Sequence, residues 1–511
     1  MRWILLSVLV SSIAVAAPVV LEGTLPEGGP DFVMVPFDVP AGTVELEIAH
    51  PSQQPSNILD YGVFDPSGFR GWGGGNSENL IIGEQAASRS YLPGPMPAGQ
   101  WAVVIGKAKI ITTPATYRLE IDLRTTATLA PQTARTPFTR VTLSSEARWY
   151  QGDLHVHSRE SGDAEPTLDA IALFAAMRGL DFVELSDHNT TAQLSWINDA
   201  QSRSSRVLFL PGVEFTTYAG HANGIGSTKY VDHRLGYQDV SLDSALAAFA
   251  QDDVVFSINH PLLDLGMTCI GCAWKHPLPK SQLGAIEIQT GGFDKTGLIF
   301  GKQTLAYWER LSSQGLHLAP VGGSDDHSGG TGTGSFDSPI GNPTTVVFAS
   351  SLEPSAIVAG IRAGHTVVKL QGPADPMIDL RVGNSMVGDT VSVISSDPAK
   401  VEGVSLTATL SDIDQGTTLV VLKDGQEWRN AGLTPGTTSW SEALTEPGRY
   451  RAELRVNGEP RTVTNNLWVV STMPPAKNAG CSSVPLEGLC LLAALAWLSR
   501  KPPLPLGRGP G

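Results

Sequence analysis

The sequence has little positive charge. Lysine and arginine total 35 of 511 residues against 50 aspartate and glutamate, and the formal net charge is −15. Proteins that bind nucleic acid or anionic membranes non-specifically carry the opposite balance. The composition therefore argues against a nucleic-acid partner. The negative charge is compatible with a secreted enzyme that binds cations and a small-molecule substrate. The content of 54 Gly and 36 Pro residues is typical of a loop-rich, β-rich extracellular protein.

Cysteine is also scarce, with four residues in the chain. Cys269 and Cys272 form a C-x-x-C pattern, and no second pair lies nearby to complete a zinc knuckle. In an exported protein this spacing favours a disulfide that closes a small loop. Cys481 and Cys490 belong to the C-terminal tail.

The apolar run near the C-terminus is short. Gly488–Leu498 falls below the roughly 20 residues that a membrane-spanning helix needs. Cys481-Ser482-Ser483 precedes this run, and Arg500 and Lys501 follow it. This arrangement, within residues 476–511, resembles the C-terminal sorting signal of myxobacteria, which implies processing and anchoring at the cell surface or membrane. The alternative is a degenerate hydrophobic tail with no anchoring role.

The N-terminus has the features of a signal peptide. Arg2 supplies the positive charge, an apolar run extends from Ile4 to Val15, and Ala14-Val15-Ala16 forms a small-residue cleavage site. We expect residues 1–16 to be removed and the protein to be exported. A buried N-terminal strand is the alternative.

Hydrophobic periodicity divides the remaining chain into three regions. Residues 18–125 contain short alternating strands between Pro, Gly and Ser turns, which predicts a β-sandwich. Residues 146–372 alternate strand-like and helical runs in units of about 30 residues, which implies parallel strands. Seven or eight such units predict an α/β fold, a closed and distorted (β/α)7–8 barrel. Residues 374–472 predict a second small β-sandwich. The helical runs are expected at 166–179, 192–202, 242–250, 303–313 and 354–363.

The middle region carries a set of metal-capable side chains. His155 and His157 stand at i and i+2 near the end of its first strand, where an extended chain points both to one side. Because the active site of a β/α barrel lies at the carboxyl ends of its strands, we expect the donors that follow later strands to meet there. These donors are His188, Glu214, His221, His260, Asp325 and His327, with Asp187 beside His188. Together they exceed what one zinc ion needs, and Glu214 could bridge two ions.

Five motifs in this order resemble the PHP (polymerase and histidinol phosphatase) superfamily of metallohydrolases, and within it the carbaryl-hydrolase-type CehA/McbA branch. The resemblance covers residues 146–370. Upstream, Phe69-Arg70-Gly71-Trp72 and Tyr91-Leu92-Pro93-Gly94-Pro95 also resemble the N-terminal domain of that branch. The five motifs are Asp153-Leu154-His155-Val156-His157, Ser186-Asp187-His188-Asn189, Gly212-Val213-Glu214, Asn259-His260-Pro261 and Gly323-Ser324-Asp325-Asp326-His327.

The resemblance implies two or three divalent ions. Zinc, manganese and iron all suit a ligand set of His, Asp and Glu without thiolate. The family often adds a carboxylate from a Ser-Asp-Gly element, but here the order is Ser161-Gly162-Asp163, which leaves the part played by Asp163 open. By similarity, the first ion would be held by His155, His157, Glu214 and Asp325, the second by Glu214, His221 and His260, and the third by His188 and His327.

Hydrolysis by a metal-activated water follows from such a site. Asp187 would either orient an imidazole, as carboxylate partners of ligating histidines commonly do, or accept a proton in catalysis. The substrate is either a phosphoester or an ester, amide or carbamate, and Arg159 is the only basic residue next to a motif, which tilts the balance slightly away from a dedicated phosphatase. A non-catalytic surface binding protein with a metal-stabilised barrel is an alternative of another class. Nothing in the sequence indicates an oligomeric state.

Overall fold

The structure is a computed structural model that describes residues 18–292, 297–332 and 338–474. The predicted signal peptide, residues 1–16, and the predicted sorting tail, residues 476–511, lie outside the described residues. Among the described helices, none combines the length and the apolar character needed to span a membrane. Strands predominate over helices and form several separate sheets.

The N-terminal region consists of two four-stranded antiparallel sheets with strand orders β1-β8-β3-β6 and β2-β7-β4-β5. Leu46 and Ile48 of one sheet and Trp101 and Val103 of the other are buried in one shared core. Glu47, between Leu46 and Ile48, points away from that core, as the period of two along a strand requires. The strands are β1 (Val19–Thr24), β2 (Phe32–Val39), β3 (Glu45–Ala49), β4 (Ile58–Asp65), β5 (Gly68–Gly74), β6 (Leu80–Gly83), β7 (Gly99–Lys109) and β8 (Thr116–Arg124).

The middle region alternates strands and helices, and its helices form where they were expected. α1 begins after Thr167, whose hydroxyl accepts a hydrogen bond from the amide of Ala170. The elements are β9 (Arg148–Val156), η1 (Arg159–Ser161), α1 (Leu168–Met177), β10 (Phe182–Leu185), α2 (Leu194–Arg203), β11 (Leu208–Pro211), β12 (Glu214–Thr217), β13 (Gly220–Ile225), α3 (Leu242–Ala250), β14 (Val255–Ile258), η2 (Gly266–Thr268), β15 (Leu283–Thr290), α4 (Gly297–Ser313), β16 (Ala319–Gly323), β17 (Thr344–Ala349), α5 (Pro354–Arg362) and β18 (Thr366–Lys369).

The strands of the middle region do not form the predicted closed barrel. Among the described residues they divide into two ladders, β11-β10-β9-β17-β18 and β12-β13-β14-β15-β16, and no ladder closes on itself. Pairing is parallel within β9–β11 and within β14–β16, but β12 and β13 pair antiparallel. The connection from Thr217 to Gly220 is a tight hairpin, which is too short for the crossover that parallel strands need. Isolated bridges at His188–Glu214 and Val156–Asp326 link the two ladders.

The C-terminal region continues the hydrogen bonding of the middle region. β18 pairs antiparallel with β27, so that Val367 lies opposite Thr464 within one eleven-stranded sheet. The predicted boundary between residues 372 and 374 therefore does not separate two independent sheets, although the domain boundaries as a whole stay a prediction. The strands are β19 (Met377–Val382), β20 (Ser385–Met386), β21 (Thr390–Ile394), β22 (Ser405–Ser411), β23 (Thr417–Lys423), β24 (Gln426–Gly432), β25 (Ser439–Ala443), β26 (Gly448–Val456), β27 (Glu459–Thr464) and β28 (Leu467–Thr472).

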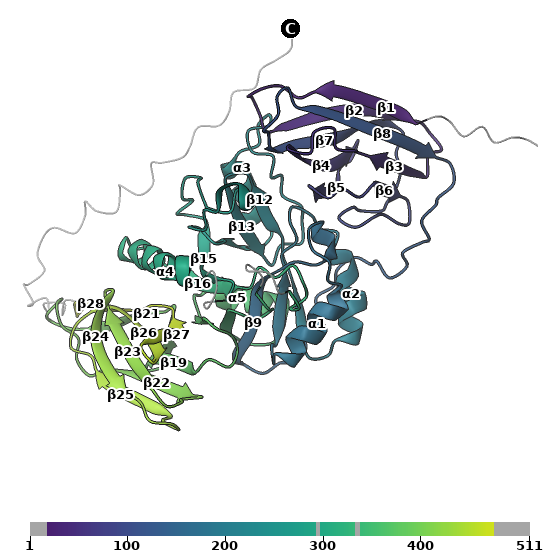
Figure 1. Cartoon of the computed structure of the whole chain (residues 1–511). Coiled ribbons are helices and arrows are strands. Elements are labelled where there is room, and N and C mark those ends of the chain that lie inside the picture. The colour runs from purple at the N-terminus through teal and green to yellow at the C-terminus, as the bar shows by residue number, and fades with distance from the viewer. Residues whose placement is uncertain (1–17, 293–296, 333–337, 475–511) are drawn as a thin grey trace, which may run out of the picture.

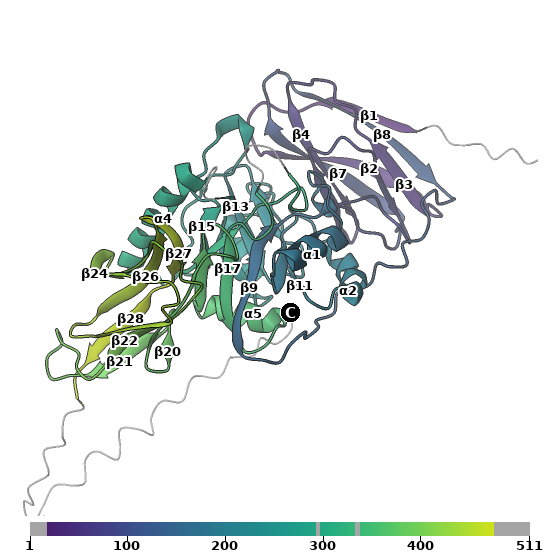
Figure 2. The same cartoon turned by 60° about the horizontal axis from the view of Figure 1, so that its bottom comes forward.

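The three regions lie in a row, with the middle region between the two β regions (Figures 1 and 2). The N-terminal region contacts the middle region next to the predicted donors: the amide of Ser90 donates to Glu160 of η1, and the hydroxyl of Tyr218 donates to Asp60 of β4. The N-terminal region is therefore positioned to form a wall beside the candidate site.

Candidate metal centre

The structure brings all of the predicted ligands together. An isolated parallel bridge pairs His188 with Glu214, and another joins Val156, between the two first histidines, to Asp326. His260 and Asp325 have positive φ angles of 27° and 56°, a backbone conformation that non-glycine residues adopt mainly where surrounding structure imposes it. By element, His155 lies in β9, His157 follows β9, His188 follows β10, Glu214 opens β12, His221 lies in β13, His260 follows β14, and Asp325 and His327 follow β16.

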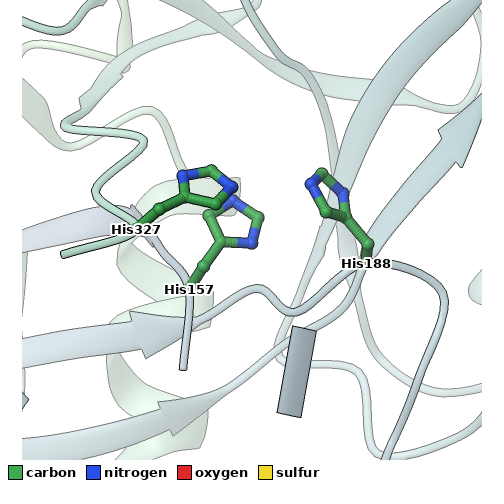
Figure 3. A group of neighbouring side chains, drawn as sticks. All are labelled: His157, His188 and His327. Carbon is green, nitrogen blue, oxygen red and sulfur yellow. The ribbon is translucent and has the colours of Figure 1, made fainter. Parts of the chain in front are cut away.

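The donor atoms form four overlapping groups, in each of which one ligand atom per residue lies within 4.8 Å of the others. Figure 3 shows one of them, with the rings of His157, His188 and His327 brought close together from three separate segments. The resemblance assigns His157 to the first ion, whereas in the structure His157 belongs to two of the donor groups. The four groups are His155, His157 and Asp325; His155, Glu214 and His260; His157, His188 and His327; and His221, His260 and Cys272.

Glu214 lies at the middle of this arrangement and is fully buried. Its Oε1 is 3.3 Å from Nε2 of His155 and 3.4 Å from Nδ1 of His221. Its Oε2 is 2.6 Å from Nδ1 of His188 and 3.7 Å from Nε2 of His157. The carboxylate thus faces imidazoles on both of its oxygens, which is the position that a bridging ligand would occupy.

Five of the six histidines also make a hydrogen bond through the ring nitrogen that faces away from Glu214, whereas His188 contacts Thr216 through Nδ1, the nitrogen that also faces Glu214. Four of the partners are carboxylate or carbonyl oxygens, which only accept, so the outer nitrogen carries the proton and the inner nitrogen presents a lone pair. A second-sphere acceptor of this kind is the usual companion of a metal-ligating histidine. The contacts are His155 to Glu287 (3.1 Å), His157 to Ser161 (3.2 Å), His188 to Thr216 (2.6 Å), His221 to the carbonyl of Ile270 (3.2 Å), His260 to the carbonyl of Cys272 (2.9 Å) and His327 to the carbonyl of Asp325 (2.9 Å).

Within the described part of the chain, two buried atoms at the centre have no hydrogen-bond partner. These are Nε2 of His155 and Oε2 of Glu214, and the second is unpartnered even though Nδ1 of His188 lies close to it. Leaving a buried donor or acceptor unsatisfied costs about 1–3 kcal/mol. A divalent cation between them would satisfy both atoms at once, so the residues present fit a metal site.

Asp163 reaches the centre. Its Oδ2 lies 3.3 Å from Nε2 of His188 and 3.6 Å from Nε2 of His327. The order Ser161-Gly162-Asp163 therefore still brings a carboxylate to the group of His157, His188 and His327. This completes a donor set of three imidazoles and one carboxylate.

Two residues outside the predicted ligand set position the donors. Glu287 of β15 accepts from Nδ1 of His155 with one oxygen and from the amide of His260 with the other, at 3.1 and 2.7 Å. Asn259 donates its side-chain amide to Oε1 of Glu214 at 2.8 Å. Asn259 could have been noticed as the first residue of the Asn-His-Pro motif, while Glu287 is marked only as a charged residue within an apolar strand.

Asp187 lies apart from the imidazoles. It is fully buried, and its two oxygens accept hydrogen bonds from the amide and the hydroxyl of Ser158 at 2.7 and 2.9 Å. Among the described contacts it makes no hydrogen bond to a histidine ring, so this structure places it to anchor the chain after His157 and not to orient an imidazole. Its role as a proton acceptor stays a prediction. Asp153 likewise anchors the backbone, because its carboxylate accepts hydrogen bonds from the amides of Ser324 and Gly341.

In the ion-free protein, the buried carboxylates and imidazoles of the centre stabilise each other's charged forms. Burial opposes the charge of Glu214, but His188, His155 and His221 together hold its pKa well below the usual range. Burial likewise opposes the imidazolium of His155, but Asp325, Glu214 and Glu287 raise its pKa well above 6.5. Burial, followed by His327 and His188, lowers the pKa of His157 to about 3. Protons on some imidazoles thus stand in for cations, and binding of a metal ion would release them.

A cleft of about 600 Å³ opens onto the centre. The middle region lines it with donors such as His188, His221 and Asp325, and the N-terminal region lines it with residues of β4 and of the loop after Trp72. No Lys or Arg is among the described residues that line it. Arg159, the one basic residue next to a motif, lines a different cavity. The described lining of the cleft therefore offers no Lys or Arg side chain to bind an anionic substrate.

The C-x-x-C pattern forms a disulfide between Cys269 and Cys272, which confirms the prediction from the sequence. Both cysteines line the cleft.

No protein-family model and no curated protein matches the chain. Several solved structures resemble parts of it. A two-domain protein from Bacteroides vulgatus, described as containing a predicted PHP-like metal-dependent phosphoesterase, has 15% identity and a TM-score of 0.37 over 65% of this chain and 99% of that chain. An amidohydrolase from Chromobacterium violaceum has 18% identity and a TM-score of 0.25 over 37% of this chain and 93% of that one.

A third is a protein from Bifidobacterium adolescentis that is assigned as a metal-dependent phosphoesterase. It has 14% identity and a TM-score of 0.25 over 36% of this chain and 89% of that one. At these TM-scores the likeness does not establish a family for this chain. Membership of the PHP superfamily, and of its CehA/McbA branch, is therefore a proposal.

Proposed function

We propose that this protein is a metal-dependent hydrolase of the PHP superfamily. The observation that carries the proposal is the set of six imidazoles gathered around a buried Glu214, five of which are hydrogen-bonded outward through one nitrogen. Histidines packed as core residues have no need of so many aligned acceptors. The two unpartnered atoms, Nε2 of His155 and Oε2 of Glu214, add to the support.

Divalent ions bound at such a site lower the pKa of water toward about 7 and polarise the bond under attack. The chain's own residues hold the ligand geometry. Glu287 keeps the proton of His155 on Nδ1, and the carbonyl of Cys272 does the same for His260. Asn259 fixes one oxygen of Glu214. These contacts preserve the inward direction of the lone pairs when a substrate enters the cleft.

For the substrate we propose a neutral ester or carbamate. The support is the absence of Lys and Arg from the described lining of the cleft, because a site dedicated to a phosphate dianion would use such side chains to bind it. A phosphoesterase is the second candidate, since two bound ions can themselves clamp phosphoryl oxygens. A non-catalytic surface protein with a metal-stabilised fold is the third.

We also propose that the protein is exported and displayed at the cell surface. The signal-peptide features of residues 1–16 and the sorting-type tail at 476–511 support this, and a small-molecule substrate outside the cell would be consistent with it.

The test combines metal analysis of the purified full-length protein with a panel of p-nitrophenyl phosphate, acetate and carbamate. We expect zinc, manganese or iron to co-purify, and the acetate or carbamate to be hydrolysed faster than the phosphate. The double variant His155→Ala with His157→Ala should lose hydrolysis while its circular dichroism stays that of a folded protein.

Full activity of that double variant would contradict the metal mechanism. Preference for the phosphate would favour the phosphoesterase. Tightly bound ions without hydrolysis of any substrate in the panel would favour the binding protein.

A further inference from the structure

The loop closed by Cys269 and Cys272 contacts two of the candidate ligands, His221 and His260, on the side that faces away from Glu214. The carbonyl of Ile270 accepts from Nε2 of His221 at 3.2 Å, and the carbonyl of Cys272 accepts from Nδ1 of His260 at 2.9 Å. The loop therefore fixes the protonated nitrogens of both rings.

The sulfur of Cys272 itself lies beside the same two rings. It forms a group with one ring nitrogen of His221 and one of His260, in which all three atoms lie within 4.8 Å of one another. Cys272 is 2% exposed, whereas Cys269 is only half-buried and faces the cleft. A thiolate with two imidazoles is a ligand set that zinc and related ions bind strongly.

We propose that the Cys269–Cys272 disulfide masks a metal ligand. While the disulfide is intact, the sulfur of Cys272 is not available, and the ion held near His221 and His260 keeps an open position. Reduction frees Cys272 to bind that ion and closes the position that hydrolysis needs. This inference rests on the proposed metal-dependent function and adds a redox control to the same site.

The chemistry of the switch balances. Reduction breaks the S–S bond and takes up two electrons and two protons, one proton for each sulfur. A dithiol supplies them and becomes a disulfide, and a phosphine with one water supplies them and becomes a phosphine oxide. When Cys272 then binds the ion, its thiol proton passes to solvent, because the thiolate is the ligand form.

The loop backbone should keep its place after reduction. Gly271 has a φ of 77°, and a Cβ there would lie 2.2 Å from the carbonyl oxygen of Thr217, so only glycine fits against β12. Directly after the loop, the amide of Trp274 donates to the carbonyl of Pro261 at 3.0 Å. Around a tetrahedral zinc ion, sulfur and nitrogen ligands lie about 3.6 Å apart. Because the sulfur of Cys272 lies within 4.8 Å of both ring nitrogens, a freed Cys272 side chain needs a shift of no more than about 1 Å.

The test loads the full-length protein with Co²⁺ and records its absorption before and after treatment with a phosphine, which unlike a dithiol does not compete strongly for the ion. We expect no thiolate-to-cobalt charge-transfer band in the oxidised protein and a band equivalent to one thiolate after reduction, together with a loss of hydrolysis. Alkylation and mass spectrometry give the state of the two cysteines independently.

Two matched variants separate the sulfurs. Cys269→Ser leaves Cys272 permanently free, so the band should be present without reductant and activity should be low throughout. Cys272→Ser retains the tail cysteines but should show no band in either state and should not respond to the phosphine. Circular dichroism checks that both variants are folded, and the reduced wild type provides the same test without any substitution.

Bound Co²⁺ without a charge-transfer band, both in the reduced wild type and in Cys269→Ser, would overturn the inference while leaving the proposed function standing. Failure of the oxidised wild type to bind Co²⁺ at all would instead contradict the proposed function, and the inference with it.

Discussion

Two buried clusters of charged side chains in this protein have opposite compositions. At the candidate metal centre, Glu214 and Asp325 face imidazoles, and no Lys or Arg lies within ion-pair distance of them among the described residues. In the second cluster, Arg451 binds both Glu309 and Glu453, at 2.8 and 2.7 Å. We call this second set, which joins α4 to β26, the arginine–glutamate cluster: Glu309, Arg449, Arg451, Glu453 and Arg455.

The difference shows which cluster needs a cation from outside. Each carboxylate of the arginine–glutamate cluster contacts two guanidinium groups, so its charge is balanced by the chain itself. The carboxylates of the candidate metal centre have no permanent positive partner, and only protonated histidines offset them. Buried charge without a partner is costly, and a bound divalent ion removes that cost. The next four predictions test this contrast.

The largest effect is expected from Glu214→Gln, which removes the central negative charge while keeping the size of the side chain. Bound metal and hydrolysis should both fall to background, because both oxygens of Glu214 face ligating imidazoles. Elemental analysis and a p-nitrophenyl ester assay measure the two quantities. Glu453→Gln makes the same chemical change in the arginine–glutamate cluster and should leave the metal content unchanged. Equal metal loss in both variants would remove the distinction between the clusters.

Arg451→Ala should lower the stability of the protein without changing its metal content. It leaves two largely buried carboxylates with one guanidinium each, and we expect a loss of about 3 kcal/mol in the free energy of unfolding, near the low end for a broken buried pair. Metal stoichiometry should stay that of the wild type. Urea unfolding of the metal-loaded protein measures the stability. A variant with wild-type stability and reduced metal content would contradict this assignment.

Glu287→Gln tests the outer partner of His155. The amide removes a charged acceptor from Nδ1 of His155, and metal affinity should fall about 10–100-fold, the usual effect of changing a partner of a ligating histidine. Competition with a fluorescent chelator gives the affinity. As a matched control, Glu309→Gln should leave the affinity as it is. An unchanged affinity in Glu287→Gln would show that His155 does not depend on this contact.

The smallest expected difference is a pH effect on the arginine–glutamate cluster. Burial opposes ionisation of Glu309, but Arg449 and Arg451 lower its pKa below the reference value of 4.5, and Arg451 and Arg455 do the same for Glu453. A depressed folded-state pKa adds stability that is present above pH 4.5 and is lost as the pH falls through the folded value. The metal-free wild type should therefore lose more stability on acidification than the double variant Glu309→Gln with Glu453→Gln. Parallel stability curves would contradict the pKa directions.

The proximity of the candidate ligands could be predicted from the sequence because each donor lies at or near the end of a strand or within a short motif. His155 and His157 lie at i and i+2, and Asn259-His260-Pro261 follows an apolar strand. Strand ends converge whether or not a barrel closes, so the wrong barrel prediction did not disturb the prediction that these residues meet. The donor groups that the structure assembles contain all of the predicted ligands.

The features that could not be predicted from the sequence depend on contacts between segments that are far apart in the chain. Glu287 contacts His155 from 132 positions away, and nothing in its own strand marks it as a partner. The continuity of the sheet from β18 to β27 joins Val367 to Thr464 across the whole C-terminal region. The prediction of a closed barrel was wrong at the tight hairpin between β12 and β13, which pair antiparallel. Alternating periodicity in a sequence does not distinguish parallel from antiparallel strands.

X-ray absorption spectroscopy of the zinc-loaded, oxidised protein would show whether the six imidazoles bind metal. We expect a first shell of nitrogen and oxygen, with the outer-shell scattering of several imidazoles and no sulfur. A folded protein that retains no zinc, or zinc surrounded only by oxygen without imidazole scattering, would contradict this expectation.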